Sequence, residues 1–308
     1  MCYYDIDIYR GKGTMSQAKK TVQTAYAKIN LHLDITGIMP NGYHSVNTVM
    51  QSVSLCDTVT LTKRDDGCFT VTCNIPAVPT GNDNLAVKAA LAFCRTTGCA
   101  LGADIHIEKH IPMAGGMAGG SADAAAVLRG MNQLCGTPLT TEELCGIGSV
   151  LGADVPFCIV GGSAYADGKG DILHPFPPMP NCTLVVACGG EGVSTPVAYK
   201  MLDDIHDGFG EQSVYEPRSM QELSDACKGG DIGAVTNAMY NIFEQPILSV
   251  RPVAAEIKRI MLECGAMGAM MSGSGPSVFG IFDSNESAAK AADAIKKMGV
   301  TPHLCQPI

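Results

Sequence analysis

The sequence predicts an α+β fold, with strands and helices mixed along the whole chain. Three observations lead to this prediction: segments whose apolar residues alternate with period two, segments with helix-capping residues at their ends, and turn residues between neighbouring strands. A doubly wound α/β fold would instead alternate strand and helix regularly and would not contain hairpins. The 308 residues suffice for one large or two medium domains.

Composition excludes several classes of protein. Hydrophobic residues make up 46% of the chain and charged residues 17%, which is typical of a folded protein and not of a disordered one. The net charge of −9 argues against nucleic-acid binding, which needs a basic surface. Apolar runs such as residues 184–188 are far too short to span a membrane, and the N-terminus lacks the apolar region of a signal peptide. We expect a cytoplasmic protein with neither nucleic acid nor membrane as a partner.

The 14 cysteines are scattered from Cys2 to Cys305 and form no CxxC pair. Several lie inside apolar runs, as Cys158 does. We therefore expect reduced, buried cysteines that behave as small hydrophobic residues.

The first predicted element is a strand over residues 24–36. Its odd-numbered positions are apolar and predict one buried face, whereas the other face carries Tyr26, Lys28, Asn30, His32 and Asp34. From the strand alone, Lys28 is expected to be a solvated surface residue. A turn with Asn-Gly chemistry follows at residues 39–42.

Residues 57–63 and 68–74 are predicted to form a second hairpin, with the bend at Asp65-Asp66-Gly67. The next elements are a helix at 84–97 that ends before Gly98, a strand at 103–109, helices at 121–134 and 140–151, and a strand at 155–166.

The proline cluster at residues 175–180 is taken as a domain boundary. It divides the chain into a domain at 15–178 and a domain at 179–308, preceded by an expected disordered tail at 1–14. In the second domain we predict a strand at 182–188, a helix from Ser194/Thr195, helices near 219–228, 231–243 and 249–264, strands at 267–271 and 277–282, a helix at 286–298 and a strand at 301–304.

A glycine-rich loop that leads directly into an alanine-rich helix is the strongest functional signal. It comprises Pro112, Met113, Ala114, Gly115, Gly116, Met117, Ala118, Gly119 and Gly120, and the helix follows at Ser121. Glycines let the backbone approach a bulky anion, and the first turn of a helix offers unpaired N–H groups with a positive dipole end. The pattern indicates a phosphate-binding loop.

Two known phosphate-binding patterns do not fit this loop. The Walker A lysine is missing, because Ser121-Ala122 follow Gly120. The dinucleotide pattern GxGxxG is absent, because Met117 stands at its second glycine. A plain flexible connector is the alternative, and the strongly helical segment that follows makes it the weaker one.

Other candidates are weaker when each is taken alone. Asp154, between a predicted helix end and strand, suits a general base but equally a turn or cap. Tyr43 and His44 could stack on a base and bond its edge, although a loop histidine is usually just exposed. The loop at 268–277 could be a hairpin or a second phosphate-facing loop, and spacing cannot decide.

These blocks gain meaning from their combination and order. The set resembles the GHMP kinase superfamily over residues 24–305, nearly the whole chain. The quoted blocks are Tyr26-Ala27-Lys28-Ile29-Asn30-Leu31, Asn41-Gly42-Tyr43-His44, the run from Pro112 to Ala125, Gly152-Ala153-Asp154-Val155-Pro156, and Met271-Ser272-Gly273-Ser274-Gly275-Pro276-Ser277. The first, second and fourth blocks are most similar to members that phosphorylate a cytidine-diphosphate-linked alcohol.

The resemblance implies a two-domain GHMP kinase fold, with a ribosomal-S5-like N-terminal domain, a ferredoxin-like C-terminal domain and the site between them. It implies a base at Asp154 with Lys28 beside it. It places Asn30, Tyr43 and His44 at the substrate, Asn84 and Lys109 near the adenosine of ATP, and residues 112–121 around the phosphates. Mg²⁺ is expected with ATP, and Ser121 is a candidate ligand.

The implied reaction is ATP-dependent phosphorylation of the 2-hydroxyl of a cytidine-diphosphate-linked methylerythritol, in the non-mevalonate route to isoprenoids. Positioning, charge neutralisation and a group that orients the hydroxyl are what phosphoryl transfer requires. Two alternatives stay open: a superfamily kinase acting on mevalonate, homoserine or a sugar, and an inactive nucleotide-binding regulator on the same fold.

Overall fold

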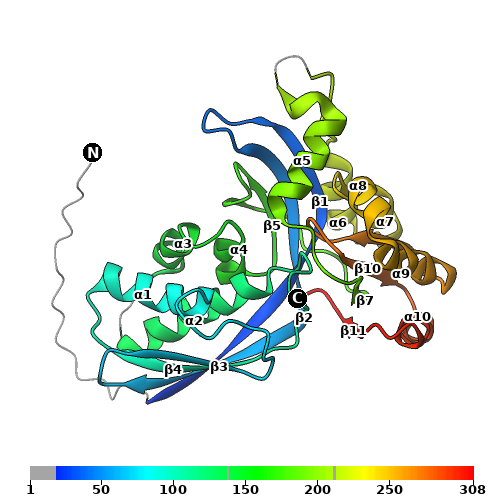
Figure 1. Cartoon of the computed structure of the whole chain (residues 1–308). Coiled ribbons are helices and arrows are strands. Elements are labelled where there is room, and N and C mark those ends of the chain that lie inside the picture. Colours follow the sequence, from blue (N-terminus) through cyan, green and yellow to red (C-terminus); the bar gives the residue numbers. More distant parts are fainter. Residues whose placement is uncertain (1–18, 137–138, 211–212) are drawn as a thin grey trace.

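The computed structural model describes residues 19–136, 139–210 and 213–308 (Figure 1). The expected tail at 1–14 lies outside these residues. The described chain contains a seven-stranded sheet and a four-stranded sheet, both accompanied by helices, so the α+β prediction is confirmed. No helix in the described ranges is long and apolar enough to cross a membrane.

The seven-stranded sheet is built around two long antiparallel strands, β1 (Lys20–Ile38) and β2 (His44–Arg64). Its main order is β3-β4-β2-β1-β8, with β3 at Phe69–Cys73 and β4 at Gly102–Glu108. The first half of β2 instead pairs with β5 (Ser163–Asp167), which pairs with β6 (Ile172–Pro175).

The predicted hairpin at 57–74 is wrong, because β4 lies between its two strands. β2 pairs antiparallel with β4, and β3 pairs parallel with β4, with Phe69 opposite Ala103. The chain does bend at the acidic residues 65–67, but the strand that follows, β3, lies at the edge of the sheet and not next to β2. Turn residues alone do not distinguish these two paths.

Four helices lie on one side of the seven-stranded sheet (Figure 1): α1 (Leu85–Thr97), α2 (Gly119–Cys135), α3 (Thr141–Ser149) and α4 (Asp154–Val160). The capping signals explain where two of them begin. The Asn84 side chain accepts a hydrogen bond from the N–H of Ala86, and Thr140 forms a capping box with Glu143. Buried alanines on α2 let that helix pack closely on the sheet.

The predicted strand at 155–166 is also wrong. Residues 154–160 form the short helix α4, and only residues 163–167 are a strand, β5. Pro156 was the missed signal, because proline suits the first turn of a helix and removes a donor from a strand. The consequence matters for the site, since Asp154 begins a helix instead of lying between a helix end and a strand.

The four-stranded sheet has the order β11-β7-β10-β9, with bounds Pro302–Cys305, Thr183–Cys188, Ser277–Phe282 and Gly268–Met271. Helices α9 (Pro252–Glu263) and α10 (Asn285–Lys297) bury their apolar faces against it. The remaining helices of this half are α5 (Thr195–His206), the 3-10 turn at Asp207–Phe209, α6 (Gln221–Gly229), α7 (Ile232–Ala238) and α8 (Glu244–Val250).

The helix predicted at 231–243 ends early, at Ala238. Residues Tyr240–Asn241 form the short strand β8, which pairs parallel with β1 at His32 and Leu33. The C-terminal half thus adds a strand to the large sheet. The domain boundary near residue 178 stays a prediction.

Both faces of β1 are buried over residues 27–35, which overturns the expectation that Lys28 is a surface residue. Lys28, Asn30, His32 and Asp34 are all less than 5% exposed. The C-terminal half covers this polar face: the backbone N–H of Asn30 donates to the hydroxyl of Ser272, and Tyr215 donates to Asp34. Period-two alternation shows which face is apolar, but it does not show what packs on the other face.

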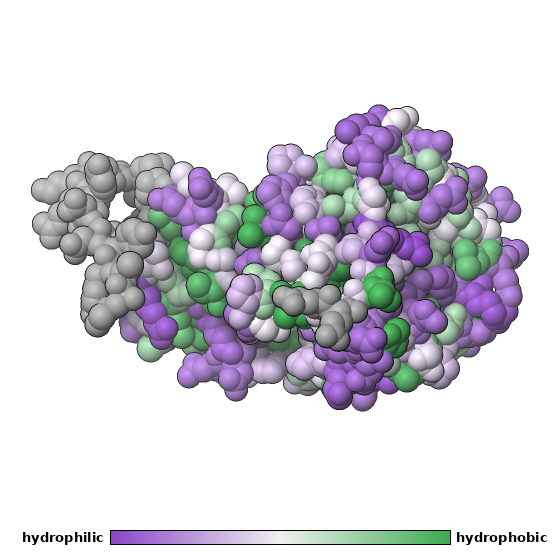
Figure 2. Space-filling view, turned by 90° about the horizontal axis from the view of Figure 1, so that it is seen from above, coloured by the Kyte–Doolittle hydropathy of each residue, from purple (hydrophilic) through white to green (hydrophobic). Residues whose placement is uncertain are grey.

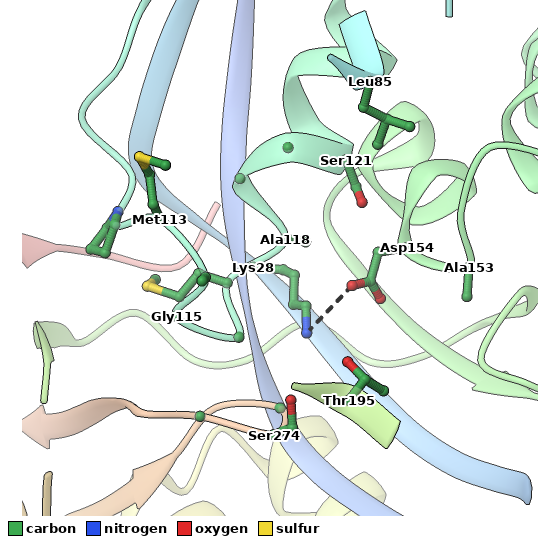
Figure 3. A pocket seen from close by; sticks show the side chains of 18 of the residues that line it. Lys28, Leu85, Met113, Gly115, Ala118, Ser121, Ala153, Asp154, Thr195 and Ser274 are labelled. Carbon is green, nitrogen blue, oxygen red and sulfur yellow. Dashed lines mark ion pairs between the residues drawn. The ribbon is translucent and has the colours of Figure 1, made fainter. Parts of the chain in front are cut away.

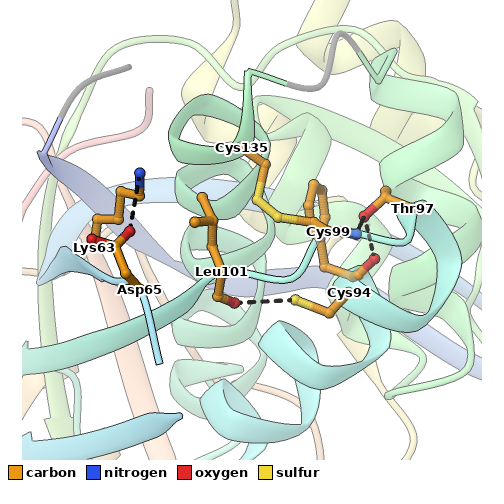
Figure 4. Close-up of a disulfide and its surroundings, with 8 residues drawn as sticks. Lys63, Asp65, Cys94, Thr97, Cys99, Leu101 and Cys135 are labelled. Carbon is orange, nitrogen blue, oxygen red and sulfur yellow. Dashed lines mark hydrogen bonds and ion pairs between the residues drawn. A yellow bond between two sulfur atoms is a disulfide. The ribbon is translucent and has the colours of Figure 1, made fainter. Parts of the chain in front are cut away.

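The expectation that the cysteines are reduced is wrong for one pair. Cys99 and Cys135 form a disulfide between the C-terminal ends of α1 and α2, with their Cα atoms 6.5 Å apart (Figure 4). Gly98 ends α1 in the left-handed conformation and turns the chain there, which brings Cys99 to the end of the neighbouring helix. The other cysteines in the described ranges are free.

The molecular surface is mostly hydrophilic on the face seen from above, with small, separated hydrophobic clusters (Figure 2). Scattered apolar residues of this kind are normal for a folded protein.

Candidate active site

A cavity of about 760 Å³ lies where the two sheets meet. Its lining residues come from elements far apart in the sequence: β1, the glycine loop, the starts of α1, α2, α4 and α5, and the loop between β9 and β10. A size of several hundred cubic ångströms suits a bound metabolite or nucleotide.

The glycine loop forms one wall of this cavity and ends at α2. Ala118, the residue before the helix, has φ 56°, a left-handed conformation that non-glycine residues seldom adopt. Its side chain does not cap the helix, so the first-turn N–H groups at Gly119 and Gly120 are left to face the cavity. The 17-residue helix also directs the positive end of its dipole there.

The loop between β9 and β10 holds the glycine loop in place. The hydroxyl of Ser272 donates to the carbonyl of Gly116 over 3.1 Å. The backbone N–H of Ser277 donates to the carbonyl of Gly115, also over 3.1 Å. A Cβ at Gly116 would collide with the Ser272 carbonyl, so glycine is required at this close approach. The β9–β10 segment is therefore a hairpin and also part of the cavity wall.

Lys28 and Asp154 face each other across the cavity (Figure 3). The ammonium of Lys28 lies 3.9 Å from Asp154 Oδ2 and donates to Asn30 Oδ1 over 2.6 Å. The Lys28 side chain is 5% exposed, whereas that of Asp154 is 37% exposed. A buried cation thus lies beside a carboxylate that is open to the cavity, and the Ser121 hydroxyl lies nearby.

Comparison with known proteins agrees with this geometry. The family model for the GHMP kinases N terminal domain matches residues 84–162, and the model for GHMP kinases C terminal matches residues 223–301. A 4-diphosphocytidyl-2-C-methyl-D-erythritol kinase of Alkaliphilus metalliredigens is 41% identical over 281 residues, which is 91% of this chain and 94% of that protein. The chain belongs to the GHMP kinase family.

Solved structures of the GHMP kinase family share the fold. A crystal structure of 4-(cytidine 5'-diphospho)-2C-methyl-D-erythritol kinase is 29% identical, with a TM-score of 0.77, and the match covers 93% of this chain and 99% of that one. Homoserine kinase from Cytophaga hutchinsonii is 20% identical with a TM-score of 0.71, covering 97% of each chain, and shows likeness of fold alone. The two-domain GHMP kinase fold and small-molecule kinase class predicted from the sequence are confirmed.

The predicted adenosine residues Asn84 and Lys109 both line the cavity. Asn84 caps α1, and its side-chain amide also donates to the Pro79 carbonyl. The ammonium of Lys109, however, donates to Asp57 Oδ2 over 2.5 Å and to Asp123 Oδ2 over 2.7 Å. Its charge is therefore engaged by two carboxylates, which sequence reasoning did not anticipate.

This buried triad lies directly beneath the first turn of α2. A Cβ at Gly119 would come within 3.0 Å of the Lys109 ammonium. Asp57 is fully buried and also accepts the backbone N–H groups of His110 and Ile111. Burial raises the pKa of Asp123 to about 7, with the Lys109 ammonium acting in the opposite direction. The triad joins β2, the residue that follows β4, and α2 at the floor of the cavity.

Tyr43 and His44 do not line this cavity, although both follow the predicted turn. Tyr43 is 63% exposed, whereas His44 is held by Asp203 Oδ1 over 2.7 Å. The His44 ring lies 4.6 Å from that of Tyr199, and Tyr199 does line the cavity. Tyr199 and Asp203 were missed, because two positions on an amphipathic helix carry no signal of their own until α5 is placed beside His44.

The structure thus brings together Lys28, Asn30, Asp154 and residues 112–121, and it leaves Tyr43 and His44 at the side of the same region. Across the described ranges, no group of three or more His, Cys, Asp or Glu residues could hold a metal ion by itself.

Proposed function

We propose that this protein is a 4-diphosphocytidyl-2-C-methyl-D-erythritol kinase, which transfers the γ-phosphoryl group of ATP to the 2-hydroxyl of its substrate. The observation that carries the proposal is one cavity in which a glycine loop at a helix N-terminus faces a Lys28–Asp154 pair. The similarity to kinases of that name over about nine-tenths of the chain supports the choice of substrate.

In this mechanism the oxygen of the substrate hydroxyl attacks the γ-phosphorus of ATP, and the bond between the γ-phosphorus and ADP breaks. Asp154 accepts the proton that the hydroxyl loses. Asp154 suits the role because its carboxylate is open to the cavity. Lys28 stabilises negative charge on the transferred group. Asn30 orients the Lys28 ammonium, and its own amide is fixed by donating to the Thr48 hydroxyl over 2.8 Å.

The glycine loop binds the ATP phosphates through the backbone N–H groups of the first turn of α2. Residues 112–118 shape the approach, and the anchoring by Ser272 and Ser277 keeps the loop from collapsing into the space for the phosphates. Asn84 and Lys109 lie on the adenosine side of the cavity in this proposal. Fixed positioning of this kind supplies much of the catalysis in phosphoryl transfer.

The oxygen donors of the cavity fit a magnesium ion that arrives with ATP. Mg²⁺ is usually held by one or two carboxylates together with substrate phosphates, and the Ser121 hydroxyl and Asp154 carboxylate are the donors at hand. The bound ion would neutralise charge on the phosphates.

The cytosine of the substrate is proposed to lie against Tyr43, His44 and Tyr199. An aromatic ring offers a stacking surface, and His44 presents a ring edge whose orientation is fixed by Asp203. Because ATP and this substrate are both polyanions that do not cross membranes unaided, we also propose that the enzyme acts in the cytoplasm.

A coupled ADP-release assay with a panel of alcohols tests the proposal. The panel contains the cytidine-linked methylerythritol, its cytidine-free phosphate, mevalonate and homoserine. We expect rapid turnover of the first compound alone, because the others lack the binding energy of the base. Comparable turnover of any other member would reject this substrate and leave only the family-level kinase activity.

A further inference from the structure

A second cavity, of about 270 Å³, lies between α5, β8 and α8 and shares no lining residue with the first. Its walls are mixed in character: about half of the lining residues are apolar, and the polar ones include Arg218, His206, Glu244 and Gln245. The apolar lining residues are Leu202, Ile205, Met239, Ile242, Pro246 and Met270. The volume is below the roughly 300–1,000 Å³ of drug-sized pockets, so it suits a smaller molecule.

Arg218 is held in place and forms no direct ion pair in the described part of the chain, although the buried Asp34 carboxylate is near enough to interact with its charge. Its guanidinium carbon lies 4.0 Å from the centre of the Tyr240 ring, and no hydrogen bond or ion pair to the guanidinium is present within that part. A guanidinium stacked on a ring keeps its N–H groups at the edge, where they can bind a carboxylate or phosphate with two parallel hydrogen bonds.

The backbone of Arg218 is anchored to the core of the protein, although its side chain is exposed. Asp34, which is fully buried, accepts the backbone N–H of Arg218 over 2.8 Å and the hydroxyl of Tyr215 over 2.5 Å. Asp34 lies on β1, and the ring that supports Arg218 belongs to β8, which pairs with β1. The arginine is therefore preorganised by two strands of the large sheet, which lowers the cost of ordering it on binding.

The carboxylate in this cavity, Glu244, would not repel a bound anion strongly, because its charge is paired. Glu244 accepts from the Lys258 ammonium over 2.6 Å and from the N–H of Met271 over 2.9 Å, so its charge is already balanced. The His206 ring packs against Tyr215 at 4.6 Å and offers a further polar group at the wall. The cavity thus combines a cation that makes no direct ion pair in the described part of the chain with a wall that is partly apolar.

We propose that this second cavity is a binding site for a small organic anion, a phosphate or carboxylate on a short apolar chain, with Arg218 binding the anionic group. Helix α5 lies between the two cavities: Tyr199 lines the first, and Leu202, Ile205 and His206 line the second. An occupant would contact the helix whose Asp203 holds His44.

Titration calorimetry on the full chain with saturating ATP, and without any alcohol, tests this site. ATP occupies the glycine loop, so the result does not depend on the proposed kinase substrate. The probes are butyl phosphate, butyrate, inorganic phosphate and 1-butanol. We expect saturable binding of butyl phosphate or butyrate, and whichever binds more tightly identifies the anionic group. Inorganic phosphate and 1-butanol should bind at least tenfold more weakly.

Two variants and a control sharpen the result. Arg218→Gln removes the charge at an exposed position and should weaken binding at least tenfold, and Ile205→Gln should weaken it by reducing the apolar wall. Arg259→Gln, on α9, removes an arginine that is already paired with Glu256 and Glu263 and should leave binding unchanged. The proposal is overturned if neither anion binds, if Arg218→Gln binds as tightly as the parent, or if 1-butanol or inorganic phosphate binds equally well.

Discussion

Two buried lysines line the same cavity, yet their surroundings differ sharply. Lys109 is 8% exposed and donates to two carboxylates that are themselves buried, Asp57 and Asp123. Lys28 is 4% exposed, donates to the neutral Asn30 and lies 3.9 Å from a carboxylate that is open to the cavity. Burial alone therefore does not reveal the role of a lysine.

The difference teaches which charge is available for chemistry. The charge of Lys109 is balanced within the fold, and removing it would leave buried carboxylates unpaired. The charge of Lys28 is directed toward the space that a substrate would fill. We infer that Lys109 mainly stabilises the base of the cavity and that Lys28 acts in the reaction.

The largest expected effect comes from the partner of Lys28. Asp154→Asn keeps the shape of the side chain but removes the base, and general-base loss lowers rates by roughly 10²–10⁴-fold. We expect kcat to fall by that amount, measured by ADP release, while the affinity for ATP stays within about twofold. A kcat near the parent value would assign the base elsewhere.

The proposed phosphate-binding role of the glycine loop is tested best at Gly120. A Cβ there meets no heavy atom within 4 Å, so the fold should tolerate Gly120→Val, whereas a side chain at Gly119 would press on Lys109. Added bulk beside the first-turn N–H groups should weaken ATP binding by roughly tenfold or more in calorimetry.

Gly146→Val is the matched control, because Gly146 is also helical and also has no atom within 4 Å of an added Cβ, but it lies on α3 away from the cavity. If both variants bind ATP like the parent, the loop is only a connector.

The proposed contact with the cytosine ring of the substrate is tested at Tyr43. Stacking on a base contributes about 1–3 kcal/mol, so Tyr43→Ala should raise KM for the cytidine-linked alcohol by roughly tenfold to a hundredfold. The KM for ATP should hardly change. Because Tyr43 is exposed, its loss should not unfold the chain. An unchanged KM for the alcohol would remove Tyr43 from the substrate site.

The smallest expected effect concerns Asp123, the buried partner of Lys109. It is a pH dependence of the free energy of unfolding. Burial raises the pKa of Asp123 to about 7, above its value in the unfolded chain, so the folded state binds the proton more tightly. Its contribution to stability is then fully present below about pH 4 and is lost as the pH rises toward 7.

Urea titrations of the parent and of Asp123→Asn from pH 4 to 8 measure this contribution. The advantage of the parent over the variant should shrink as the pH rises through this range, because Asn carries no proton to lose. A difference that is constant with pH would mean that Asp123 stays ionised throughout.

The sequence was informative about local signals. It predicted the helices α1 and α3, the glycine loop, and the strands that build the small sheet, because each follows from residues close together in the chain. It failed where distant segments decide the outcome. β4 inserts between β2 and β3, and the polar face of β1 is covered by residues beyond 200.

The residues of the candidate site also differ in how far the sequence predicts them. Lys28 and Asp154 could be paired only through the family resemblance, since neither the spacing nor the strand pattern brings them together. Tyr199, Asp203 and the carboxylates around Lys109 gave no sequence signal, because their importance comes from neighbours in space.

A direct comparison of Lys28→Met with Lys109→Met, measuring melting temperature and kcat of the folded protein, tests the central claim. Breaking a buried ion pair costs about 3–5 kcal/mol, so Lys109→Met should melt at least roughly 6 °C lower, with kcat at low temperature within about tenfold of the parent. Lys28→Met should melt close to the parent but lose roughly 10²–10³-fold in kcat. The reverse pattern, a stable but inactive Lys109→Met beside an unstable but active Lys28→Met, would contradict the account.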